Sequence, residues 1–185
     1  MCAAANTGTV SARRVTTTAL FAALLAASAT ISLPFGTVPV TMQVLMIVLI
    51  ALVLPRGWAA FAVAAYLLVG AVGLPVFSGL RGGLSVLAGP TGGYLIGFLL
   101  AVAAGAWIRE TLSRSVASVI VVDSVTAVIV VVIVYAAGWA QLVLVSGMDP
   151  LAALGAGVLP FLIPDGLKAA AAVLLAPSVR RAAGG

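Results

Sequence analysis

Residues 116–146 read VASVIVVDSVTAVIVVVIVYAAGWAQLVLVS, a stretch in which Asp123 is the only charged side chain. A hydrocarbon core ~30 Å thick needs about 20 apolar helical residues. As one straight helix this stretch would rise ~46 Å, so we expect it to cross a membrane with its start at or beneath the cytoplasmic interface. Asp123 would then lie near the lipid headgroups, as an interfacial helix-start residue with no further role.

The rest of the chain has the same apolar character. Of its 185 residues, 64% are hydrophobic and 7% are charged, with a mean hydropathy of +1.32, whereas soluble domains carry ~25% charged residues. This composition excludes a water-soluble globule. The sequence has no His and only one Cys, Cys2, which excludes disulfide frameworks, zinc ligand sets and catalysis by an imidazole base. We expect a membrane protein without catalytic residues, metal or cofactor.

Charged residues and Gly/Pro clusters divide the chain into six candidate spans. They form one transmembrane domain, residues 1–185, in which residues 1–12 are expected to be flexible. An even number of spans places both termini on the same side of the membrane. The predicted fold class is therefore an all-α bundle of six transmembrane helices. The spans are 15–33, 41–54, 57–74, 91–108, 116–146 and 163–179.

The basic residues mark one face of this bundle. Short loops rich in Lys and Arg stay in the cytoplasm, and seven of the nine cations fall in segments that six alternating spans place on one side. We therefore predict that both termini are cytoplasmic. Because the cations come singly or in pairs without interleaved aromatics, we expect no nucleic-acid partner. The seven cations are Arg13, Arg14, Arg56, Arg109, Arg114, Arg180 and Arg181.

The N-terminus allows a second interpretation. Arg13 and Arg14, the apolar stretch after them and Ala27-Ser28-Ala29 also resemble a secretory signal with a small-residue cleavage site. Cleavage there would leave five spans and invert the charge assignment. We favour a first membrane helix, because the apolar stretch continues beyond the possible cut.

The two remaining cations, Arg81 and Lys168, fall on the outer face. Arg81 lies in residues 75–89, a loop that is rich in Gly and otherwise apolar. Loops of this length usually have a function of their own. We expect a lid over an outer site, and a plain connector with one solvated Arg is the alternative.

Lys168 follows Asp165 by three positions at the start of the last span. Pro164 suits a first helical turn, and Asp165 complements the positive end of the helix dipole. Residues three apart share a helix face, and ionisable groups at membrane depth usually line a substrate pathway or pair with each other. We predict that Lys168 binds an anion and Asp165 binds N–H donors of one polar ligand. The alternative is a capping Asp with a Lys that reaches the headgroups.

A glycine-rich helix start adds a third candidate on the same face. Residues 89–94 read GPTGGY, and free backbone N–H groups there, together with Thr91, could receive an anion or a carbonyl. Pro-x-Gly-Gly also forms ordinary turns. This helix start is expected on the same outer face as Lys168 and Arg81. Thr91 and Tyr94 are therefore candidate ligand contacts.

Uncharged polar and aromatic side chains supply further candidates. Thr41 and Gln43 stand at the outer end of the second span and could bind an amide-like ligand as donor and acceptor, or simply begin the helix. Tyr135 and Trp139 are four residues apart on the fifth span. They form either a packing or lipid-facing pair, or the wall for a flat ligand ring.

Small residues indicate where helices meet. Ala19, Ala23 and Ala27 recur at every fourth position of the first span. Lipid provides no hydrophobic drive for helix association, so such residues mark contact surfaces. We expect this ridge to contact a neighbouring span or a partner protein, and Gly93 and Gly97 to make an internal contact.

Four ordered motifs resemble the BioY family, the biotin-specific substrate-capture (S) components of energy-coupling factor (ECF) vitamin transporters in prokaryotes. The resemblance runs from about residue 12 to the C-terminus, and four motifs in order are more specific than any one alone. They are VPVTMQ at 38–43, GLPVF at 73–77, GPTGGY at 89–94 and GVLPFLIPDGLK at 157–168.

The resemblance implies six helices that enclose biotin near the outer face, beneath the loops after spans one, three and five. It implies biotin uptake across the prokaryotic cell membrane with a transmembrane coupling protein and two cytoplasmic ATPases, or in some members without the ATPase module. The chain itself would hydrolyse nothing. In that family the small-residue ridge of the first span meets the coupling protein, which assigns Ala19, Ala23 and Ala27 to this contact. The family's ligand motifs carry over to Asp165, Lys168 and Gln43.

The chemistry of biotin fits the candidate side chains. Biotin offers two ureido N–H donors, a ureido carbonyl, an apolar bicycle and a carboxylate, so its site needs an acceptor, a donor, an apolar wall and a cation. We expect Asp165 at the ureido group and Lys168 or Arg81 at the carboxylate.

Two positions depart from the family's pattern. Trp139 follows Gly138 directly and Gln141 stands where a Trp is frequent, while Ser78-Gly79 replace an Asn that some members have in the third loop. Either change could alter the ring wall or a ureido contact.

Three other functions are weighed against biotin uptake. The same fold could capture another vitamin or a small anion, since a fold does not determine its ligand. A small intramembrane enzyme would need Asp165 and Asp123 as a catalytic dyad, although the two acids are expected on opposite faces of the membrane. A purely structural membrane subunit would bind no ligand.

Overall fold

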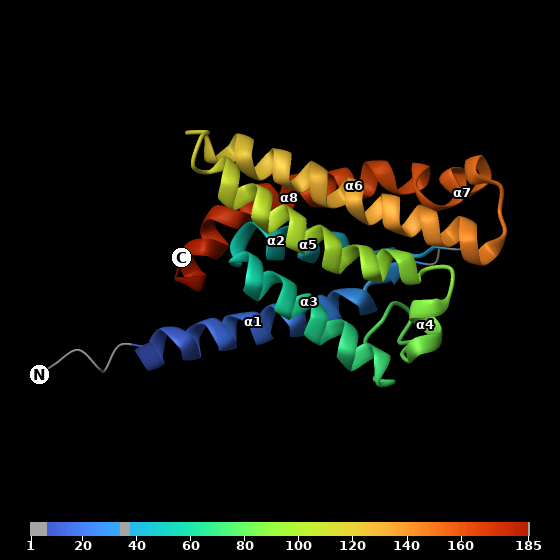
Figure 1. The fold of residues 1–185 in the computed structure, drawn as a ribbon, viewed down its shortest axis with the longest axis horizontal. Helices are drawn as coiled ribbons and strands as arrows, with labels where there is room; N and C mark the ends of the chain where they lie inside the picture. The colour runs from blue at the N-terminus through green and yellow to red at the C-terminus, as the bar shows by residue number, and fades with distance from the viewer. Residues whose placement is uncertain (1–6, 34–37, 185) are drawn as a thin grey trace, which may run out of the picture.

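The chain forms a bundle of helices that is closed at one end by short strands and loops (Figure 1). The computed structural model describes residues 7–33 and 38–184. Part of the segment predicted to be flexible, residues 1–6, lies outside the described residues, and the first helix begins at Thr7. The elements are α1 (Thr7–Thr30), β1 (Ser32–Leu33), β2 (Val40–Thr41), α2 (Gln43–Val53), α3 (Arg56–Ala71), α4 (Leu84–Ala88), α5 (Gly92–Leu112), α6 (Val119–Ser146), α7 (Pro150–Gly157), the 3-10 turn η1 (Leu159–Phe161) and α8 (Leu162–Ala183).

Each predicted span overlaps one of the long helices, but the helices differ in length. Three segments are long and apolar enough to cross a membrane by themselves: Gly92–Leu112, Val119–Ser146 and Pro150–Ala183. The helices α2 and α3 are apolar but shorter. Large apolar side chains, among them Phe61 and Leu174, are exposed on the outside of the bundle, where lipid would cover them. The fold is that of a membrane protein.

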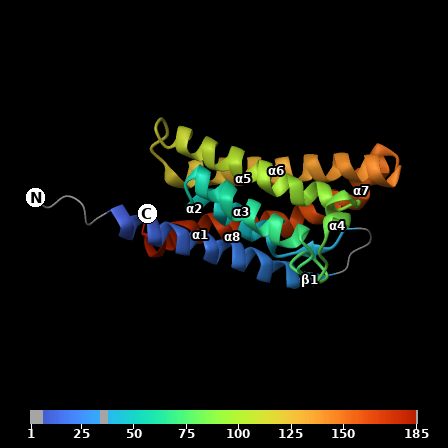
Figure 2. The same cartoon turned by 60° about the horizontal axis from the view of Figure 1, so that its bottom comes forward.

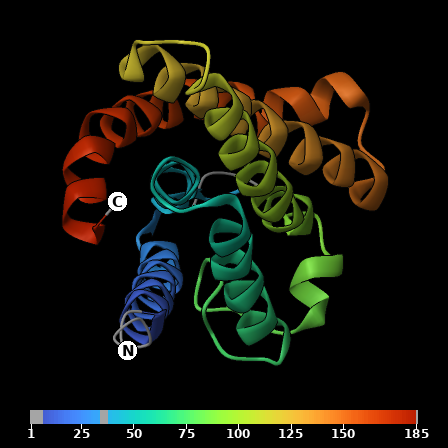
Figure 3. The same cartoon turned by 60° about the vertical axis from the view of Figure 1, so that its left-hand side comes forward.

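The helix α2 lies in the centre of the bundle. Figure 3 shows it surrounded by α1, α3, α5 and α8, and it also contacts α6. Its side chains are buried almost throughout, with Ile47, Val48 and Ile50 fully inaccessible. A helix of eleven residues would be short for crossing a ~30 Å core alone, but here the neighbouring helices shield it from lipid.

The helices α5 and α6 make the closest pair in the fold. A Cβ atom added at Gly93 would overlap the Ala137 carbonyl oxygen, and one added at Gly97 would press on Ala137 and Val134. Small residues allow such close backbone approach between membrane helices. The predicted internal role of Gly93 and Gly97 is confirmed.

The charges separate toward the two ends of the bundle. Figures 1 and 2 place both termini and the α5–α6 turn at one end, opposite α4 and α7. The seven arginines assigned to one face all stand on segments at this end, which we call the arginine end; we call the opposite end the pocket end. Glu110 and Asp123 are the acids of the arginine end, and Asp149 and Asp165 belong to the pocket end.

Asp123 is a buried structural anchor at the arginine end, which corrects its expected role as an interfacial helix-start residue. Its side chain is 1% exposed, and its Oδ1 and Oδ2 accept hydrogen bonds from Arg109 Nε at 2.9 Å and Arg180 Nη2 at 2.8 Å. Arg180 Nη1 also donates to the Leu52 carbonyl at 3.0 Å. One carboxylate thus ties α5, α6, α8 and the end of α2 together.

The pocket end contains structure that the spans alone did not predict. The helix α7 starts with Asp149 as its N-cap, whose Oδ1 accepts hydrogen bonds from the Leu151 and Ala152 amides, and with Pro150 in its first turn. In the loop 75–89, Phe77 and Arg81 pair through their backbones, and Gly83 N donates to Gly70 O at 2.7 Å. The predicted lid is therefore an ordered segment fastened to α3.

Candidate functional site

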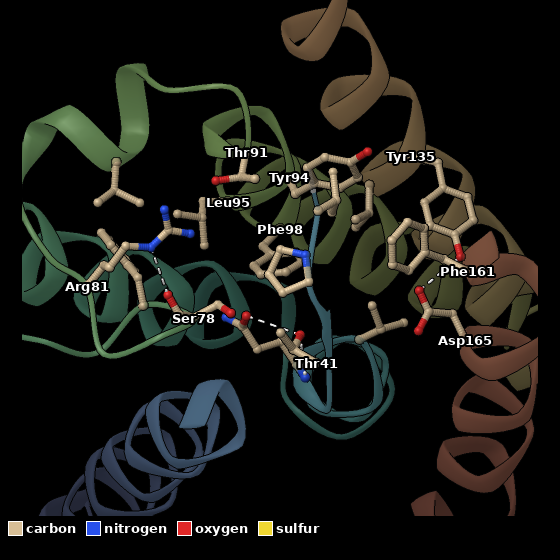
Figure 4. A pocket seen from close by; sticks show the side chains of 17 residues that line it. Thr41, Ser78, Arg81, Thr91, Tyr94, Leu95, Phe98, Tyr135, Phe161 and Asp165 are labelled. Carbon is tan, nitrogen blue, oxygen red and sulfur yellow. Dashed lines mark hydrogen bonds between the residues drawn. The ribbon is translucent and has the colours of Figure 1, made fainter. Parts of the chain in front are cut away.

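A pocket opens at the pocket end between α2, α5, α6 and α8 (Figure 4). It contains about 620 Å³ of atom-free space, part of it open to solvent. Its walls are mainly apolar with a few polar groups, as is typical of small-molecule sites. The lining residues are Val38, Pro39, Thr41, Gln43, Val44, Phe77, Ser78, Arg81, Val86, Thr91, Tyr94, Leu95, Phe98, Val134, Tyr135, Phe161 and Asp165.

Asp165 is the centre of the polar network on the α8 side of the pocket. It is 4% exposed, its Oδ1 lies 2.6 Å from Lys168 Nζ, and its Oδ2 accepts a hydrogen bond from the Tyr135 hydroxyl at 2.9 Å. A carboxylate has about four lone-pair sites, so capacity remains for N–H donors of a ligand. Two donors also hold the carboxylate in one orientation.

Lys168 connects α8 to the first outer loop. Besides Asp165, its ammonium group donates to the Thr41 carbonyl at 2.8 Å. It is not among the pocket-lining residues, so it supports Asp165 from behind. Both side chains were predicted to hold the ligand, but the ammonium group of Lys168 bonds to Asp165 and to the Thr41 carbonyl and does not line the pocket.

A hydrogen-bonded chain runs from Thr41 to the loop between α3 and α4. The Thr41 hydroxyl donates to Gln43 Oε1 at 3.2 Å, and Gln43 Nε2 donates to the Tyr66 hydroxyl at 2.8 Å. Tyr66 in turn donates to the Val76 carbonyl at 3.2 Å. Gln43 is 3% exposed, which makes it a buried, positioned pocket residue rather than a solvated helix start.

Arg81 supplies a cation at the other side of the pocket. Figure 4 shows Arg81 and Asp165 at opposite sides, with the ring of Phe98 between them. Arg81 Nε donates to the Ser78 carbonyl at 3.1 Å, and no other residue in the described part of the chain accepts from its guanidinium, which leaves N–H groups for an anion. The Ser78 hydroxyl is buried and has no hydrogen-bond partner among the described residues, so a ligand atom could satisfy it.

The space between these polar sides is aromatic and apolar. Phe77, Phe98 and Phe161 line it and are at most 3% exposed. Tyr94 packs its ring against Gly138, where a Cβ would overlap it, and donates its hydroxyl to the Gly157 carbonyl at 2.7 Å. The absence of a side chain at Gly138 thus leaves the space on α6 that the Tyr94 ring occupies.

The structure brings most of the predicted ligand residues to one place. Thr41, Gln43, Arg81, Asp165, Thr91 and Tyr94 line the pocket, and Lys168 contacts two residues of that set. Sequence reasoning did not select Tyr135, although it had weighed the residue as part of a ring wall. It missed Phe77 and Phe161, and it noted Ser78 only as a departure from the family's pattern. Phe77 and Phe161 stand within the quoted motifs at 73–77 and 157–168, which was the available signal.

Gln141 marks one departure from the family pattern. Its Nε2 donates to the Leu87 and Gly89 carbonyls at 2.7 and 2.8 Å. These bonds fasten the turn between α4 and α5 to α6. Gln141 therefore holds the end of the outer loop in place without lining the pocket. Trp139 does not line the pocket either; its Nε1 donates to the carbonyl of Pro150, the first residue of α7, at 3.0 Å.

The predicted partner ridge lies on the bundle surface. Ala19, Ala23 and Ala27 are all exposed on α1. A shallow apolar groove beside them is lined by residues of α1 and α3, with Ala23 at its border. The ridge is thus open to a neighbour outside the chain.

The described residues form neither a metal-binding cluster of acidic, His or Cys side chains nor a pair of catalytic acids. No group of three or more His, Cys, Asp or Glu side chains that could hold a metal lies within residues 7–33 and 38–184. Asp123 stands twelve residues before Tyr135 on α6, a rise of ~18 Å, while Tyr135 is the partner of Asp165. The two acids do not form a dyad.

Comparison with known proteins gives a consistent result. The profile of the BioY family matches residues 4–185. The chain is 37% identical to a biotin transporter BioY of Rhizobium etli, over 92% of this chain and 94% of that protein. It is 35% identical to the biotin transporter BioY2 of Lactococcus lactis, over 84% and 83% of the two chains.

The fold is also that of a solved structure. The crystal structure of the S-component for biotin from an ECF-type ABC transporter superposes with a TM-score of 0.87 at 24% identity. The match covers 97% of this chain and 95% of the solved one. The two chains therefore share one architecture over nearly their whole length.

Proposed function

The chain belongs to the BioY family, and on that premise we propose that it captures biotin and takes it up across the membrane as the substrate-binding component of an ECF-type transporter. The observation that carries this proposal is the pocket with two opposed polar sides. Asp165, with Lys168 and Tyr135, forms one side, Arg81 the other, and aromatic rings lie between them. This order of groups matches a ureido ring, an apolar bicycle and a carboxylate.

The ureido group is assigned to the Asp165 side. The carboxylate of Asp165 accepts ureido N–H bonds with the lone pairs that Lys168 and Tyr135 leave free. Lys168 keeps the carboxylate oriented, and burial makes these charge-assisted bonds stronger than they would be in water. The side chain of Gln43 adds a donor for the ureido carbonyl.

The carboxylate of biotin is assigned to Arg81. Lys168 is already bonded to Asp165 and to the Thr41 carbonyl, so it has little capacity for a second anion. Arg81 uses one N–H on the Ser78 carbonyl, and a guanidinium binds a carboxylate with two parallel bonds. Thr91 lines the pocket at the start of α5 and offers a hydroxyl to the same anion.

Isothermal titration with biotin and biotinamide, in which a carboxamide replaces the carboxylate, tests these assignments. Arg81→Ala is expected to weaken biotin about 10-fold or more, as for a lost hydrogen bond to a charged group, and to leave biotinamide unchanged. Lys168→Ala is expected to weaken both ligands equally. Arg114→Ala, at the arginine end, is the control. If Lys168→Ala affects biotin alone and Arg81→Ala affects neither ligand, the carboxylate belongs to Lys168.

A failure of biotin to bind the wild-type protein would overturn the function itself. A panel of other vitamins in a thermal-shift assay then identifies the ligand. Mass spectrometry of small molecules retained by the purified protein gives the same answer independently.

The proposed arrangement in the membrane has six spans and both termini in the cytoplasm. The gathering of seven arginines at the end with both termini supports it, because Lys and Arg in short loops stay inside. The pocket then faces the outside of a prokaryotic cell. In a Cys2→Ala background, reaction of single cysteines introduced at Ser113 and Gly155 with a membrane-impermeant reagent tests this, and labelling of Ser113→Cys in intact cells contradicts it.

The proposed partners are a transmembrane coupling protein and two ATPases, with ATP hydrolysis confined to the latter and no cofactor on this chain. The exposed ridge of Ala19, Ala23 and Ala27 supports a close helix contact, since small residues let backbones approach. Ala23→Leu is expected to abolish co-purification with the coupling protein while biotin binding persists. Ala103→Leu, on an exposed position of α5, is the matched control.

A further inference from the structure

A second pocket lies at the arginine end, away from the proposed biotin site. It is formed by the first described turns of α1, the turn between α2 and α3, and the last turns of α8. Arg13, Arg14 and Arg180 all line it, together with the side chain of Thr17. Three of the nine cationic residues of the sequence thus line one cavity, and the Arg180 guanidinium is at the same time bonded to Asp123 and to the Leu52 carbonyl.

Most of the hydrogen-bond donors in this pocket are unused. Arg13 Nη2 donates to the Ala182 carbonyl at 3.3 Å, and its guanidinium packs against Gly184, which leaves four of its five N–H groups. Among the described residues, no partner contacts the Arg14 guanidinium or the Thr17 hydroxyl. The pocket therefore has many donors aimed at a ligand with several acceptors.

Among the described residues, no acidic side chain pairs with Arg13 or Arg14. Of the two acids at the arginine end, Asp123 is buried and paired with Arg109 and Arg180, and Glu110 accepts from the Arg56 backbone amide at 3.1 Å. Seven arginines against two acids leave this end with a net charge of +5, the whole net charge of the protein. An anion from outside the chain would compensate it.

We propose that this pocket binds a phosphate group, supplied by the headgroup of an anionic phospholipid. Planar guanidinium groups bind phosphate oxygens with paired bonds, and basic pockets between membrane helices on the cytoplasmic side bind anionic headgroups. Thr17, Leu20 and Leu24 are spaced three and four residues apart on α1, and the two leucines are 56% and 43% exposed. Acyl chains of a lipid held at Thr17 would lie along this stripe.

Native mass spectrometry after purification from micelles with equal phosphatidylglycerol and phosphatidylcholine tests the proposal. The wild type is expected to retain phosphatidylglycerol preferentially. Arg13→Gln/Arg14→Gln should lower that retention about tenfold or more, since at least one charge-assisted bond is lost per side chain. Arg114→Gln/Arg181→Gln removes the same charge from the same end outside the pocket and should leave retention unchanged.

Changing the charge of Arg13 and Arg14 could also alter how the protein inserts into the membrane, so a variant that keeps the charge serves as a second test. Thr17→Val removes one donor from the pocket and should reduce phosphatidylglycerol retention about fivefold, in line with a bond of roughly 1 kcal/mol. Equal losses in the two double variants, or no loss in Arg13→Gln/Arg14→Gln and in Thr17→Val, overturn the site.

Inorganic phosphate separates the two sources of the anion. Added without lipid, it should raise the melting temperature of the protein less than phosphatidylglycerol does. If phosphate alone stabilises the protein through Arg13 and Arg14, while phosphatidylglycerol is retained no better than phosphatidylcholine, the lipid assignment is overturned in favour of a free phosphate.

Discussion

Lys168 Nζ lies 2.6 Å from Asp165 Oδ1, three residues apart on α8, in an ion pair whose two side chains are 11% and 5% exposed. The acid lines the pocket and the base lies behind it. Burying two charges is costly unless they pair and their other hydrogen bonds are satisfied. Tyr135 and the Thr41 carbonyl meet that condition, so the pair presents a fixed, charged acceptor to the ligand.

Removing the charge of Asp165 should abolish high-affinity biotin binding. In Asp165→Asn the buried ammonium of Lys168 loses its counter-ion and the ureido group loses its acceptor. Truncating one member of a buried charged pair costs about 2–5 kcal/mol, which corresponds to roughly a 30-fold to 4,000-fold weaker Kd. Isothermal titration measures this change. Asp149→Asn, an exposed acid of the same end, is the control, and equal affinity in both variants would refute the role of Asp165.

Enlarging Gly138 should damage the pocket through Tyr94. A Cβ in Gly138→Ala would overlap the Tyr94 ring, which lines the pocket and must shift toward the ligand. Overpacking costs about 1–3 kcal/mol, so we expect a lower melting temperature together with weaker biotin binding. Gly155→Ala is the matched control, because its Cβ would meet no atom within 4 Å. A Gly138→Ala protein with wild-type affinity contradicts the proposed contact.

Breaking the Asp123 network should lower stability without changing the pocket. Asp123→Asn leaves Arg109 and Arg180 partly buried without their shared counter-ion, and breaking a buried pair costs about 3–5 kcal/mol. The melting temperature in detergent should fall, while the Kd for biotin in the remaining folded protein stays the same. Glu110→Gln, which alters an exposed acid at the same end, should change neither quantity. An unchanged melting temperature in Asp123→Asn would show that the network is dispensable.

Removing the side chain of Gln141 should loosen the outer loop. Gln141→Ala loses both hydrogen bonds to the turn between α4 and α5, at a cost of about 1–3 kcal/mol if the carbonyls stay unpaired. We expect faster hydrogen exchange in residues 84–93 and faster dissociation of biotin. Trp139→Phe removes a comparable bond on the α7 side and should leave exchange in 84–93 unchanged. Identical exchange in the Gln141→Ala and wild-type proteins argues against this fastening.

The helices could be predicted from the sequence because apolar length and charge spacing act locally. The span predicted at 116–146 is α6 at Val119–Ser146, and the span at 163–179 lies within α8. The short helix α7 was missed, although Asp149-Pro150 is a helix-start signal. Its eight residues are too few to cross a membrane, so apolar length and charge spacing do not distinguish this stretch from a connecting loop.

The site could be predicted in part for a related reason. Asp165 and Lys168 stand out because charge is rare in this chain and three residues along a helix is a contact distance. Ser78 and Phe161 have no such signal, since a serine and a phenylalanine are ordinary in apolar segments. Their importance appears only where the Ser78 hydroxyl is left unpaired and the Phe161 ring lines the pocket.

The sequence alone determined that this protein is a helical membrane protein, approximately where its long helices lie, and that its few outer charges are concentrated near one candidate site. Tertiary structure decided which distant residues meet. Asp123 pairs with Arg180 across 57 positions, and Lys168 reaches Thr41 across 127. Burial in helices depends on local composition, whereas such pairings depend on how the helices pack around α2, and no local pattern encodes that arrangement.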